Sequence, residues 1–407
     1  MKLWGNRKNF KRIGIDRLQP GMHISLAERW LDHPFLLSEF TLEDEDQIDI
    51  IRDMGMTSVL WSEALSTAPP RNFGGAATPA AAKPAAAGAP DGARVAQAKS
   101  VRDERRERTD RARAKTVNAG KAYAAASAEL REVFTTMFTS PEAATGRAKG
   151  LVTDVVDAFA SNGDVSILLL SERLSSNNMH THAINVMLLS LMIAKPLELT
   201  AEQMRELGLG ALFHDIGMLQ IPSAVRMKPE AERSSAEHNL VRTHAEAGVR
   251  MIAAAPSIST DARTVIAMHH EQYNGGGYPF RLAAEKIPLN ARIAAIADRY
   301  DELCNPSRMQ DSVPPAEALA RMYKLEGTRF DPALLTAFIK SMGVYPAGTV
   351  VELSNGTIGL VISVNRNNTL RPLVTVWQEN CKPEDAPVID LAEEPEISIE
   401  VPQRFFA

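Results

Sequence analysis

The side chains most capable of chemistry in this 407-residue chain are histidines and aspartates gathered in one segment. Seven of the nine histidines lie between His180 and His270, and no cysteine falls in that interval. Imidazole and carboxylate together suit divalent Fe, Mn or Zn, and seven such groups are too many for one tetrahedral ion. The pattern therefore predicts two divalent metal ions, with the candidate ligands His182, His214, Asp215, His244, His269, His270 and Asp298.

The spacing of these ligands predicts the elements that must carry them. Successive groups lie about 25 to 32 residues apart, the length of one helix, a turn and part of the next helix. Each group is therefore expected to return to the same level of a helical bundle. A single histidine is more often a core or surface residue than a ligand. Two doublets of adjacent polar residues, His214–Asp215 and His269–His270, lie in apolar runs, where several buried polar groups would lack partners unless a metal satisfies them. Four histidines outside this spacing are expected to be structural or exposed: His23, His33, His180 and His238.

The adjacent residues His214 and Asp215 would point about 100° apart within a helix. They can share one ion only near a helix end or kink, and Gly217 followed by Pro222 indicates such an end. Asp215 can bridge two ions with little distortion, which makes it the candidate to orient the nucleophile.

A glycine-rich segment follows the second doublet, in the run HHEQYNGGGYPF. Three consecutive glycines permit positive φ and close approach of main-chain amides to a ligand, although an ordinary flexible turn is the alternative. The next two residues form a rigid aromatic position that could stack on a base or contact a phosphate. The predicted substrate contacts in this segment are Gly275, Gly276, Gly277, Tyr278 and Pro279.

The elements around these residues predict a multi-domain chain with a central all-α bundle, because apolar residues recur there every three or four positions. The N-terminal part alternates apolar runs with turns and one acidic helix, whereas three β-rich runs follow the bundle. A stretch rich in Ala, Pro and Gly cannot build a packed core. The predicted order is a small α/β module at 8–65, a linker at 66–100, a charged and Ala-rich helix at 101–140, the bundle at 141–343, a small β-meander at 344–380 and a tail at 381–407.

Composition excludes several classes of protein. Hydrophobic residues make up 45% of the chain and the formal charge is −5, so no basic field exists to bind DNA or RNA. Cys304 and Cys381 are far apart and give no disulfide framework, which suits a reducing cytosol. The basic N-terminus lacks the apolar stretch of a signal peptide, and the apolar run at 184–194 is too short to span a bilayer. We expect a cytoplasmic protein without a membrane segment.

Five motifs in order resemble an HD-GYP domain: H-x-x-N-V at His182, HDIG at His214, a lone His244, HHE-x-x-N-G-x-G-Y-P at His269, and ARIAAIADRYD from Ala291. The resemblance covers roughly residues 154–343. It implies a helical HD-type bundle with a two- or three-metal centre, usually Fe or Mn, which hydrolyses the bacterial second messenger cyclic di-GMP. It also assigns the seven candidate ligands to the metals, with Asp215 as the bridge. The N-terminal module resembles the small uncharacterised domain that often precedes HD-GYP domains.

The chain departs from the family pattern at four places. Three-metal members carry a glutamate where this chain has Asn178, so two metals are expected. The lysine that follows HDIG in most members is Met218, and the usual loop aspartate is Asn274. The family's Arg-Pro-Tyr-Arg segment is replaced by CNPSRMQ, in which Arg308 is the stand-in substrate contact. Losing one preorganised contact can lower the rate about 10² to 10³-fold without abolishing metal binding.

These features predict a cyclic di-GMP phosphodiesterase in which two metals activate a water that attacks phosphorus in line. The product is the linear dinucleotide or GMP. One alternative is a degenerate domain that binds cyclic di-GMP as a receptor or scaffold with little turnover, and another is a hydrolase of a different nucleotide. The N-terminal module is expected to contact other signalling proteins, and a homodimer is left open.

Overall fold

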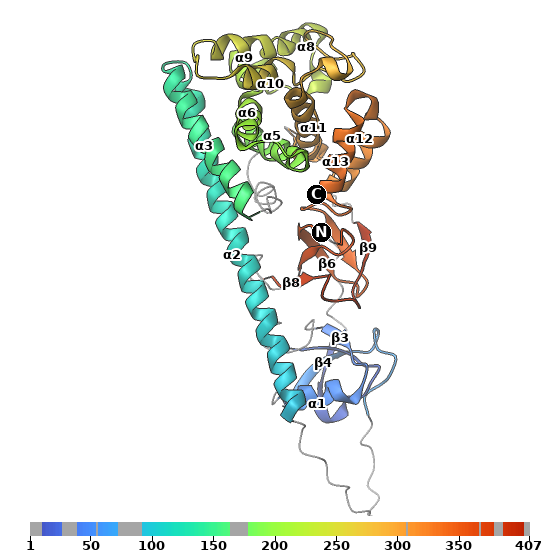
Figure 1. Ribbon diagram of the computed structural model, residues 1–407. Helices are drawn as coiled ribbons and strands as arrows, with labels where there is room; N and C mark the ends of the chain where they lie inside the picture. Colours follow the sequence, from blue (N-terminus) through green and yellow to red (C-terminus); the bar gives the residue numbers. More distant parts are fainter. Residues whose placement is uncertain are drawn as a thin grey trace, which may run out of the picture. The chain divides into compact units, whose positions relative to one another are not determined.

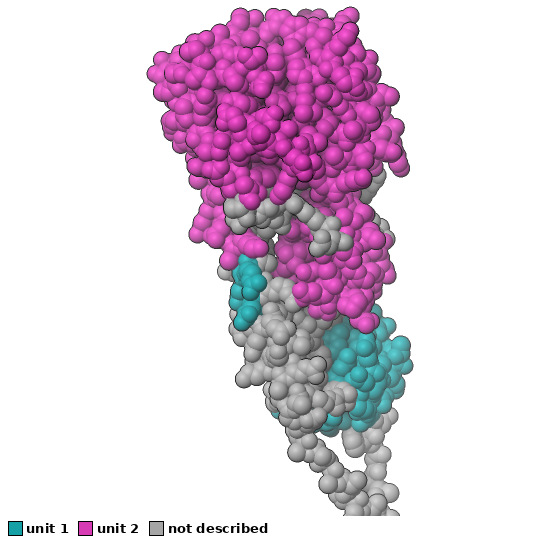
Figure 2. Space-filling model, in the orientation of Figure 1, with its two compact units in different colours: residues 1–111 teal, residues 112–407 magenta. Residues whose placement is uncertain are grey.

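The computed structural model (Figure 1) describes residues 10–26, 39–53, 56–71, 92–162, 178–306, 308–365, 368–377 and 386–402. The chain divides into two compact units, Met1–Arg111 and Ala112–Ala407, which Figure 2 distinguishes by colour. Most of the predicted linker lies outside the described residues, as does Cys381.

In the described residues, the N-terminal module is one antiparallel sheet with one α-helix. Its strand order is β1-β4-β2-β3, and every neighbouring pair is antiparallel. Ile48 and Ile51 of the helix are fully buried against the sheet residues Ile24 and Val59, because they lie three residues apart on one helical face. The elements are β1 (Phe10–Gly14), β2 (His23–Ser25), β3 (Glu39–Thr41), α1 (Glu45–Asp53) and β4 (Ser58–Ser62). A strand-rich module with one helix is therefore present, as the sequence predicts.

The next element is the long helix α2 (Gly92–Thr136), which begins nine residues before the start predicted at residue 101. Ala is the strongest helix former, so the alanines at the end of the Ala-rich linker extend the helix in the N-terminal direction. Towards the C-terminus of α2, Tyr123, Leu130, Val133 and Phe134 are buried in the core of the helical domain.

The helical domain is built around α5 (Met179–Ala194), which is buried on all faces. Helix α5 packs against α6, α11 and α13, and α6 also packs against α3 and α10. No strand occurs between residues 141 and 343 in the part of the chain that the structure describes, and no helix of the described residues has the length and apolarity needed to cross a membrane. The other helices are α3 (Pro141–Asn162), α6 (Ala201–Phe213), α7 (Ser223–Arg226), α8 (Ser235–Arg242), α9 (His244–Ile252), α10 (Thr260–Met268), α11 (Leu289–Cys304), α12 (Pro315–Lys324) and α13 (Pro332–Met342).

A second antiparallel sheet lies at the C-terminal end of the chain, with strand order β8-β7-β6-β5-β9. Two of its strands come from the segment 381–407 that the sequence assigns to a tail. These strands have only three and four residues, too short for a clear period-two pattern. The strands are β5 (Val350–Leu353), β6 (Ile358–Ser363), β7 (Leu373–Val376), β8 (Val388–Asp390) and β9 (Ile399–Pro402).

Candidate metal centre

Both polar doublets lie directly after the end of a helix. Helix α6 ends at Phe213 with His214 as its C-cap, and α10 ends at Met268 with His269 as its C-cap. Adjacent side chains can converge at such an end, and His214 Nε2 lies 3.8 Å from Asp215 Oδ2. The predicted helix end at the first doublet is thus confirmed, but Gly217 does not cause it. Gly217 lies within the short 3-10 helix η5 (Ile216–Gln220) that follows.

Gly217 instead allows two elements to approach closely. A Cβ atom at this position would lie 1.9 Å from the carbonyl oxygen of His244 and 2.5 Å from the amide nitrogen of Gly248. Helix α9 therefore packs directly on the backbone of η5. This contact brings Asp215 next to the first residue of α9, with Asp215 Oδ1 3.2 Å from His244 Nε2.

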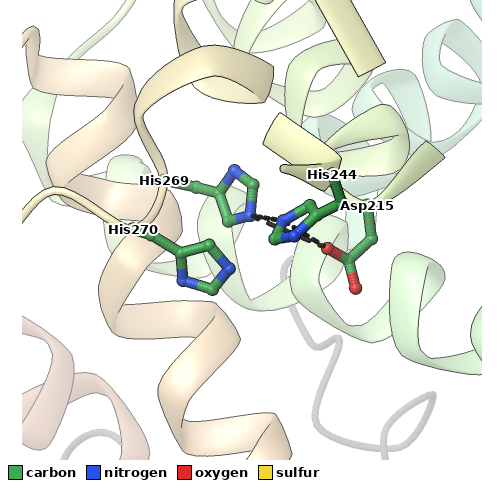
Figure 3. Close-up of side chains that lie close together, drawn as sticks. All are labelled: Asp215, His244, His269 and His270. Atoms are coloured by element: carbon green, nitrogen blue, oxygen red, sulfur yellow. Dashed lines mark hydrogen bonds and ion pairs between the residues drawn. The ribbon is translucent and has the colours of Figure 1, made fainter. Parts of the chain in front are cut away.

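Six of the seven predicted ligands come together around Asp215 in two groups that share this residue, and the seventh, Asp298, forms a third group with His214 and His269. Within each group the candidate ligand atoms lie within 4.8 Å of one another. Figure 3 shows the second group, in which two doublets and a helix N-terminus contribute side chains. Asp298 of α11 completes the cluster, with Oδ1 3.2 Å from His182 Nε2 and 3.7 Å from His214 Nε2. We call the two groups that share Asp215 the His182 group (His182, His214 and Asp215) and the His244 group (Asp215, His244, His269 and His270).

The donor atoms fit a cation in each group. His182 Nδ1 faces Asp301 Oδ2 at 2.7 Å and His214 Nδ1 faces the carbonyl of Ala211 at 2.7 Å, so both Nδ1 atoms donate a proton. Their Nε2 atoms then face each other at 3.2 Å. Two lone pairs at this distance repel unless a proton or a cation lies between them. An ion that lies about 2.1 Å from each of two nitrogens, with an N–metal–N angle of about 90–109°, would hold the two nitrogens about 3.0 to 3.4 Å apart.

The His244 group repeats this arrangement. His244 Nδ1 faces the carbonyl of Val241 at 2.7 Å, and His269 Nδ1 faces the carbonyls of Val265 and Ile266 at 3.2 Å each. Their Nε2 atoms are again 3.2 Å apart. Asp215 presents Oδ1 to this pair and Oδ2 to the other pair. The structure therefore contains a cluster that could hold divalent metal.

Burial and the carboxylates give the two members of each imidazole pair opposite pKa shifts. Burial lowers the pKa of His214 to about 4. Burial also acts to lower the pKa of His182, but its hydrogen bonds to Asp298 and Asp301 outweigh burial and raise this pKa well above its ordinary value. Burial also acts to lower the pKa of His269, but the Asp215 and Asp298 carboxylates and the carbonyl of Val265 together outweigh burial and raise this pKa. One proton is thus expected in each pair when no metal is bound.

Metal binding is therefore expected to release up to about two protons per chain at neutral pH, because each ion takes the place of the proton between two Nε2 atoms. The affinity for metal should accordingly rise with pH. Calorimetric titration of the metal-free protein with Mn²⁺ in two buffers of different ionisation enthalpy measures the number of protons. His238→Gln, a histidine outside the cluster, should release the same number as the natural chain, and heats that do not depend on the buffer would contradict the assignment.

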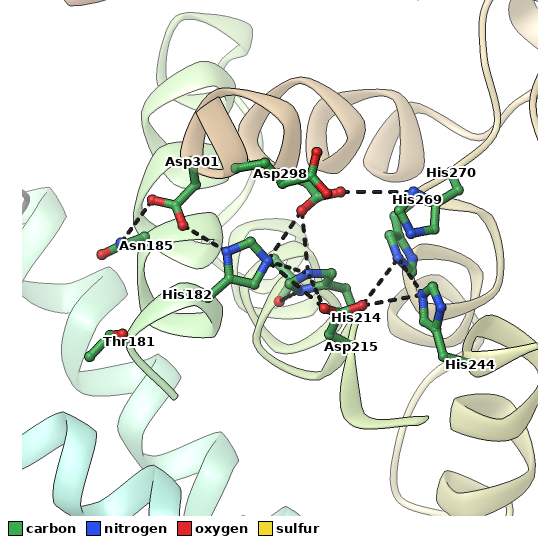
Figure 4. A network of polar contacts seen from close by, with 12 residues as sticks. Thr181, His182, Asn185, His214, Asp215, His244, His269, His270, Asp298 and Asp301 are labelled. Carbon is green, nitrogen blue, oxygen red and sulfur yellow. Dashed lines mark hydrogen bonds and ion pairs between the residues drawn. The ribbon is translucent and has the colours of Figure 1, made fainter. Parts of the chain in front are cut away.

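Sequence reasoning assigned no role to three supporting residues, which are Asp301, Asn185 and Glu271. Asp301 follows Asp298 by three residues on the same face of α11 and accepts from Asn185 Nδ2 at 2.8 Å as well as from His182 (Figure 4). Glu271, next to the second doublet, is buried, and its carboxylate accepts from three backbone amides. The spacing in ADRYD is the signal that could have revealed Asp301, whereas the amides that Glu271 binds, those of residues 280–282, carry no side-chain signal.

Two amides of the glycine loop, which is the predicted cradle for a ligand, have partners within the loop. Gly275 has φ of 79°, but its amide donates to the carbonyl of Gln272 at 2.7 Å. The Gly276 amide donates to Asn274 Oδ1 at 2.9 Å. A Cβ atom on Gly277 would lie 2.5 Å from the carbonyl of His270, so this glycine packs against the doublet. The first two amides are paired within the loop rather than directed at a ligand.

Of the other predicted substrate contacts, Tyr278 lies against a predicted metal ligand, whereas Arg308 pairs with a surface carboxylate. The Tyr278 ring stacks on His270 with centroids 4.7 Å apart, and a cis peptide bond joins it to Pro279. The guanidinium of Arg242 lies 5.2 Å from the Tyr278 ring centroid, a neighbour that sequence reasoning missed. Arg308 is exposed and paired with Glu232.

The departures at Asn178 and Asn274 each have a structural role. Asn178 is the N-cap of α5, where its side chain accepts from the amides of His180 and Thr181. Its side-chain oxygen is used for capping this helix. Asn274 accepts the Gly276 amide within the loop, a role that an asparagine oxygen fills as well as a carboxylate. His180 contacts Phe134, which agrees with its prediction as a structural residue.

Known sequence families match most of the chain. The HD domain family matches residues 166–334, and the domain of unknown function DUF3391 matches residues 10–148. The second match includes α2 and the first residues of α3, so it extends well beyond the module predicted at 8–65.

Similar proteins cover different shares of the chain. The cyclic di-GMP phosphodiesterase PA4108 of Pseudomonas aeruginosa is 31% identical over 90% of this chain and 85% of its own length. The cyclic di-GMP phosphodiesterase response regulator RpfG of Xanthomonas campestris is 33% identical over 37% of this chain and 39% of its own. The solved structure of Bd1817, a HDG"Y"P protein from Bdellovibrio bacteriovorus, is 15% identical with a TM-score of 0.47, covering 81% of this chain and 98% of Bd1817. From the first of these similarities and the two family matches, the chain belongs to the HD-GYP family of HD domain proteins and carries an N-terminal DUF3391 domain.

Proposed function

We propose that this protein is a metal-dependent phosphodiesterase that hydrolyses cyclic di-GMP to the linear dinucleotide or GMP. The observation that carries the proposal is the position of Asp215 between two imidazole pairs, with one carboxylate oxygen toward each. Such an arrangement suits two divalent ions, Fe or Mn in the proposal, that share one bridging carboxylate. The relatives named above as cyclic di-GMP phosphodiesterases support the choice of substrate.

The side chains of the centre have distinct roles in this proposal. Divalent ions at these ligands supply Lewis acidity, which lowers the pKa of water and offsets negative charge on a phosphate. Asp215 orients the attacking water, because its pKa is held well below the usual range by His214 and His244 despite burial, so it accepts a hydrogen bond as a carboxylate. Burial raises the pKa of Tyr278, so its hydroxyl keeps its proton and is the proposed donor to a phosphate oxygen.

Arg242 is the proposed substitute for the cation that is missing at Met218. It is exposed at the end of α8, and its guanidinium lies over the ring that stacks on His270. A guanidinium can bind a phosphate through two parallel hydrogen bonds, and a charged hydrogen bond contributes about 1.5 to 3 kcal/mol. This position places positive charge near the metal ligands without occupying one of them.

Arg242→Ala is therefore expected to raise the KM for cyclic di-GMP about tenfold with a smaller change in kcat. Steady-state kinetics on Mn²⁺-loaded enzyme measures both values, and Arg242→Lys should restore part of the affinity. Arg250→Ala is the control, because Arg250 is exposed and pairs with Glu246 of its own helix. An unchanged KM in Arg242→Ala would remove this residue from the substrate site.

The proposed function is tested by anaerobic metal analysis coupled to chromatography of the products. Full-length protein loaded with Fe(II) or Mn(II) is incubated with cyclic di-GMP and, separately, with other cyclic dinucleotides and with mononucleotides. Linear dinucleotide or GMP formed from cyclic di-GMP supports the proposal. Tight binding with no product would replace it with the receptor alternative, for which Met218 is the supporting departure, and equal turnover of unrelated nucleotides would overturn the substrate.

A further inference from the structure

A continuous series of hydrogen bonds leads from a metal ligand to the long helix α2. His182 Nδ1 donates to Asp301 Oδ2 at 2.7 Å, and Asn185 Nδ2 donates to Asp301 Oδ1 at 2.8 Å. The amide oxygen of Asn185 lies 3.1 Å from the hydroxyl of Tyr123 on α2. Figure 4 shows the part of this series that joins His182, Asp301 and Asn185. Three side chains thus connect α2 to the metal centre.

Burial makes each of these contacts matter. Tyr123 is 4% exposed, Asn185 is fully buried and Asp301 is 2% exposed, so an unpaired polar atom on any of them would be costly. The direction of each bond is also fixed. Asp301 is an acceptor, so Asn185 must turn its amide nitrogen to it and its oxygen to Tyr123.

The Tyr123 hydroxyl must then act as the donor, because both oxygens that it faces are acceptors. These are Asn185 Oδ1 at 3.1 Å and the carbonyl of Thr181 at 3.2 Å. Thr181 lies directly before His182 in the first turn of α5. The same hydroxyl therefore contacts both the backbone next to the metal ligand and the amide that holds the ligand's partner.

We propose that Tyr123 is a positioning residue of the metal centre. Its hydroxyl donates to Asn185 Oδ1 and holds this amide in place, and Asn185, together with Asn305, donates to Asp301 Oδ1 and so holds Asp301 in the position that keeps the His182 proton on Nδ1. His182 Nε2 is then left to face the ion of the His182 group. This inference rests on the metal binding in the proposed function, but it does not depend on which nucleotide is the substrate.

Tyr123 and the candidate metal ligands fall in different family matches. The HD domain match covers residues 166–334, whereas Tyr123 lies within the DUF3391 match at 10–148. A metal ion binds with full affinity only when the ligating side chains are held by their hydrogen-bond partners. Changing such a partner commonly lowers metal affinity 10- to 100-fold. A residue outside the HD domain match, in the part of α2 that is buried in the core of the helical domain, would thus complete the metal centre.

The test is Tyr123→Phe in the full-length protein, which removes the hydroxyl and keeps the ring. We expect the Mn²⁺ affinity of the His182 group to fall about tenfold, less than for a direct partner of a ligand, while the His244 group keeps its ion. At limiting free Mn²⁺, the electron paramagnetic resonance signal of a coupled pair should give way to that of single ions. Asn185→Ala should produce the same change, and the double variant should add little to either single change because the two residues act in one series.

Two controls separate positioning from a general loss of stability. Val133→Ala on the same helix removes fully buried methyl groups without touching the series, so it should lower Tm and leave Mn²⁺ affinity unchanged. In the metal-free protein, the His182 Nδ1–H resonance should move upfield in Tyr123→Phe but not in Val133→Ala. An unchanged resonance together with natural Mn²⁺ affinity in Tyr123→Phe would overturn the proposal, as would an equal loss of affinity in Val133→Ala. If the natural chain did not hydrolyse cyclic di-GMP, the substrate would be wrong while these measurements still decided the role of Tyr123.

Discussion

Replacement of Asp215 by asparagine is expected to abolish binding of both metal ions and to lower kcat/KM for cyclic di-GMP by roughly 10³-fold or more. Asp215 is the one side chain common to the His182 and His244 groups, and its two oxygens face different imidazole pairs. Asparagine has almost the same shape but offers one neutral oxygen in place of two charged ones. Both groups therefore lose the carboxylate that they share in a single change, and Asp298 alone remains.

Metal analysis of the purified variant and a product assay measure this prediction, and circular dichroism should show helical content close to that of the natural chain. Asp261→Asn is the matched control, because Asp261 is an exposed aspartate in the first turn of α10, the helix that ends at His269. That variant should keep both ions and the natural rate. Two ions bound at natural affinity in Asp215→Asn would refute the bridging assignment.

Gly217→Ala is the second change with a large expected effect. The added methyl group would lie 1.9 Å from the carbonyl oxygen of His244, which is backbone and cannot rotate away. Helix α9 or η5 must shift, and overpacking of this kind lowers stability by roughly 1 to 3 kcal/mol or more. The same shift separates Asp215 from His244, so metal affinity should fall together with Tm.

Gly150→Ala provides the comparison, because Gly150 is an exposed residue in the middle of α3 and an added Cβ meets no atom within 4 Å. Alanine is preferred over glycine there by about 0.5 to 1 kcal/mol, so this variant should be slightly more stable than the natural chain. Thermal unfolding and Mn²⁺ titration of both variants test the pair. A Gly217→Ala protein with natural Tm and natural metal affinity would show that the approach of η5 to α9 does not hold the centre together.

The clustering of the candidate ligands could be predicted from the sequence because metal binding restricts residue type so strongly. Histidine doublets in apolar runs are rare without a partner for their nitrogens, and the spacing of one helix and a turn brings them to one level of a bundle. The position of His214 and Asp215 at a helix end also followed from geometry, since neighbouring helical side chains diverge by about 100°. The element that ends there was identified correctly, although Gly217 serves the packing of α9 instead.

The supporting contacts could not be predicted in the same way. Tyr123 lies about 60 residues before its partner Asn185, and nothing in either residue type indicates which distant side chain it meets. The pairing of the Gly275 and Gly276 amides depends on a loop conformation that three glycines leave open. Strands β8 and β9 were missed because each is so short that its neighbours in the sheet, not its own sequence pattern, determine its conformation.

The bonds from the Nδ1 atoms of His214, His244 and His269 to main-chain carbonyls have a consequence for metal choice. These rings are oriented by carbonyl groups in the last turns of α6, α8 and α10, so we expect the cluster to keep its shape before any ion is bound. Little reorganisation accompanies the exchange of one divalent ion for another. Imidazole and carboxylate accept several first-row metals, so we expect the bound ion to be determined by the metals that the cell supplies rather than by selection by the fold.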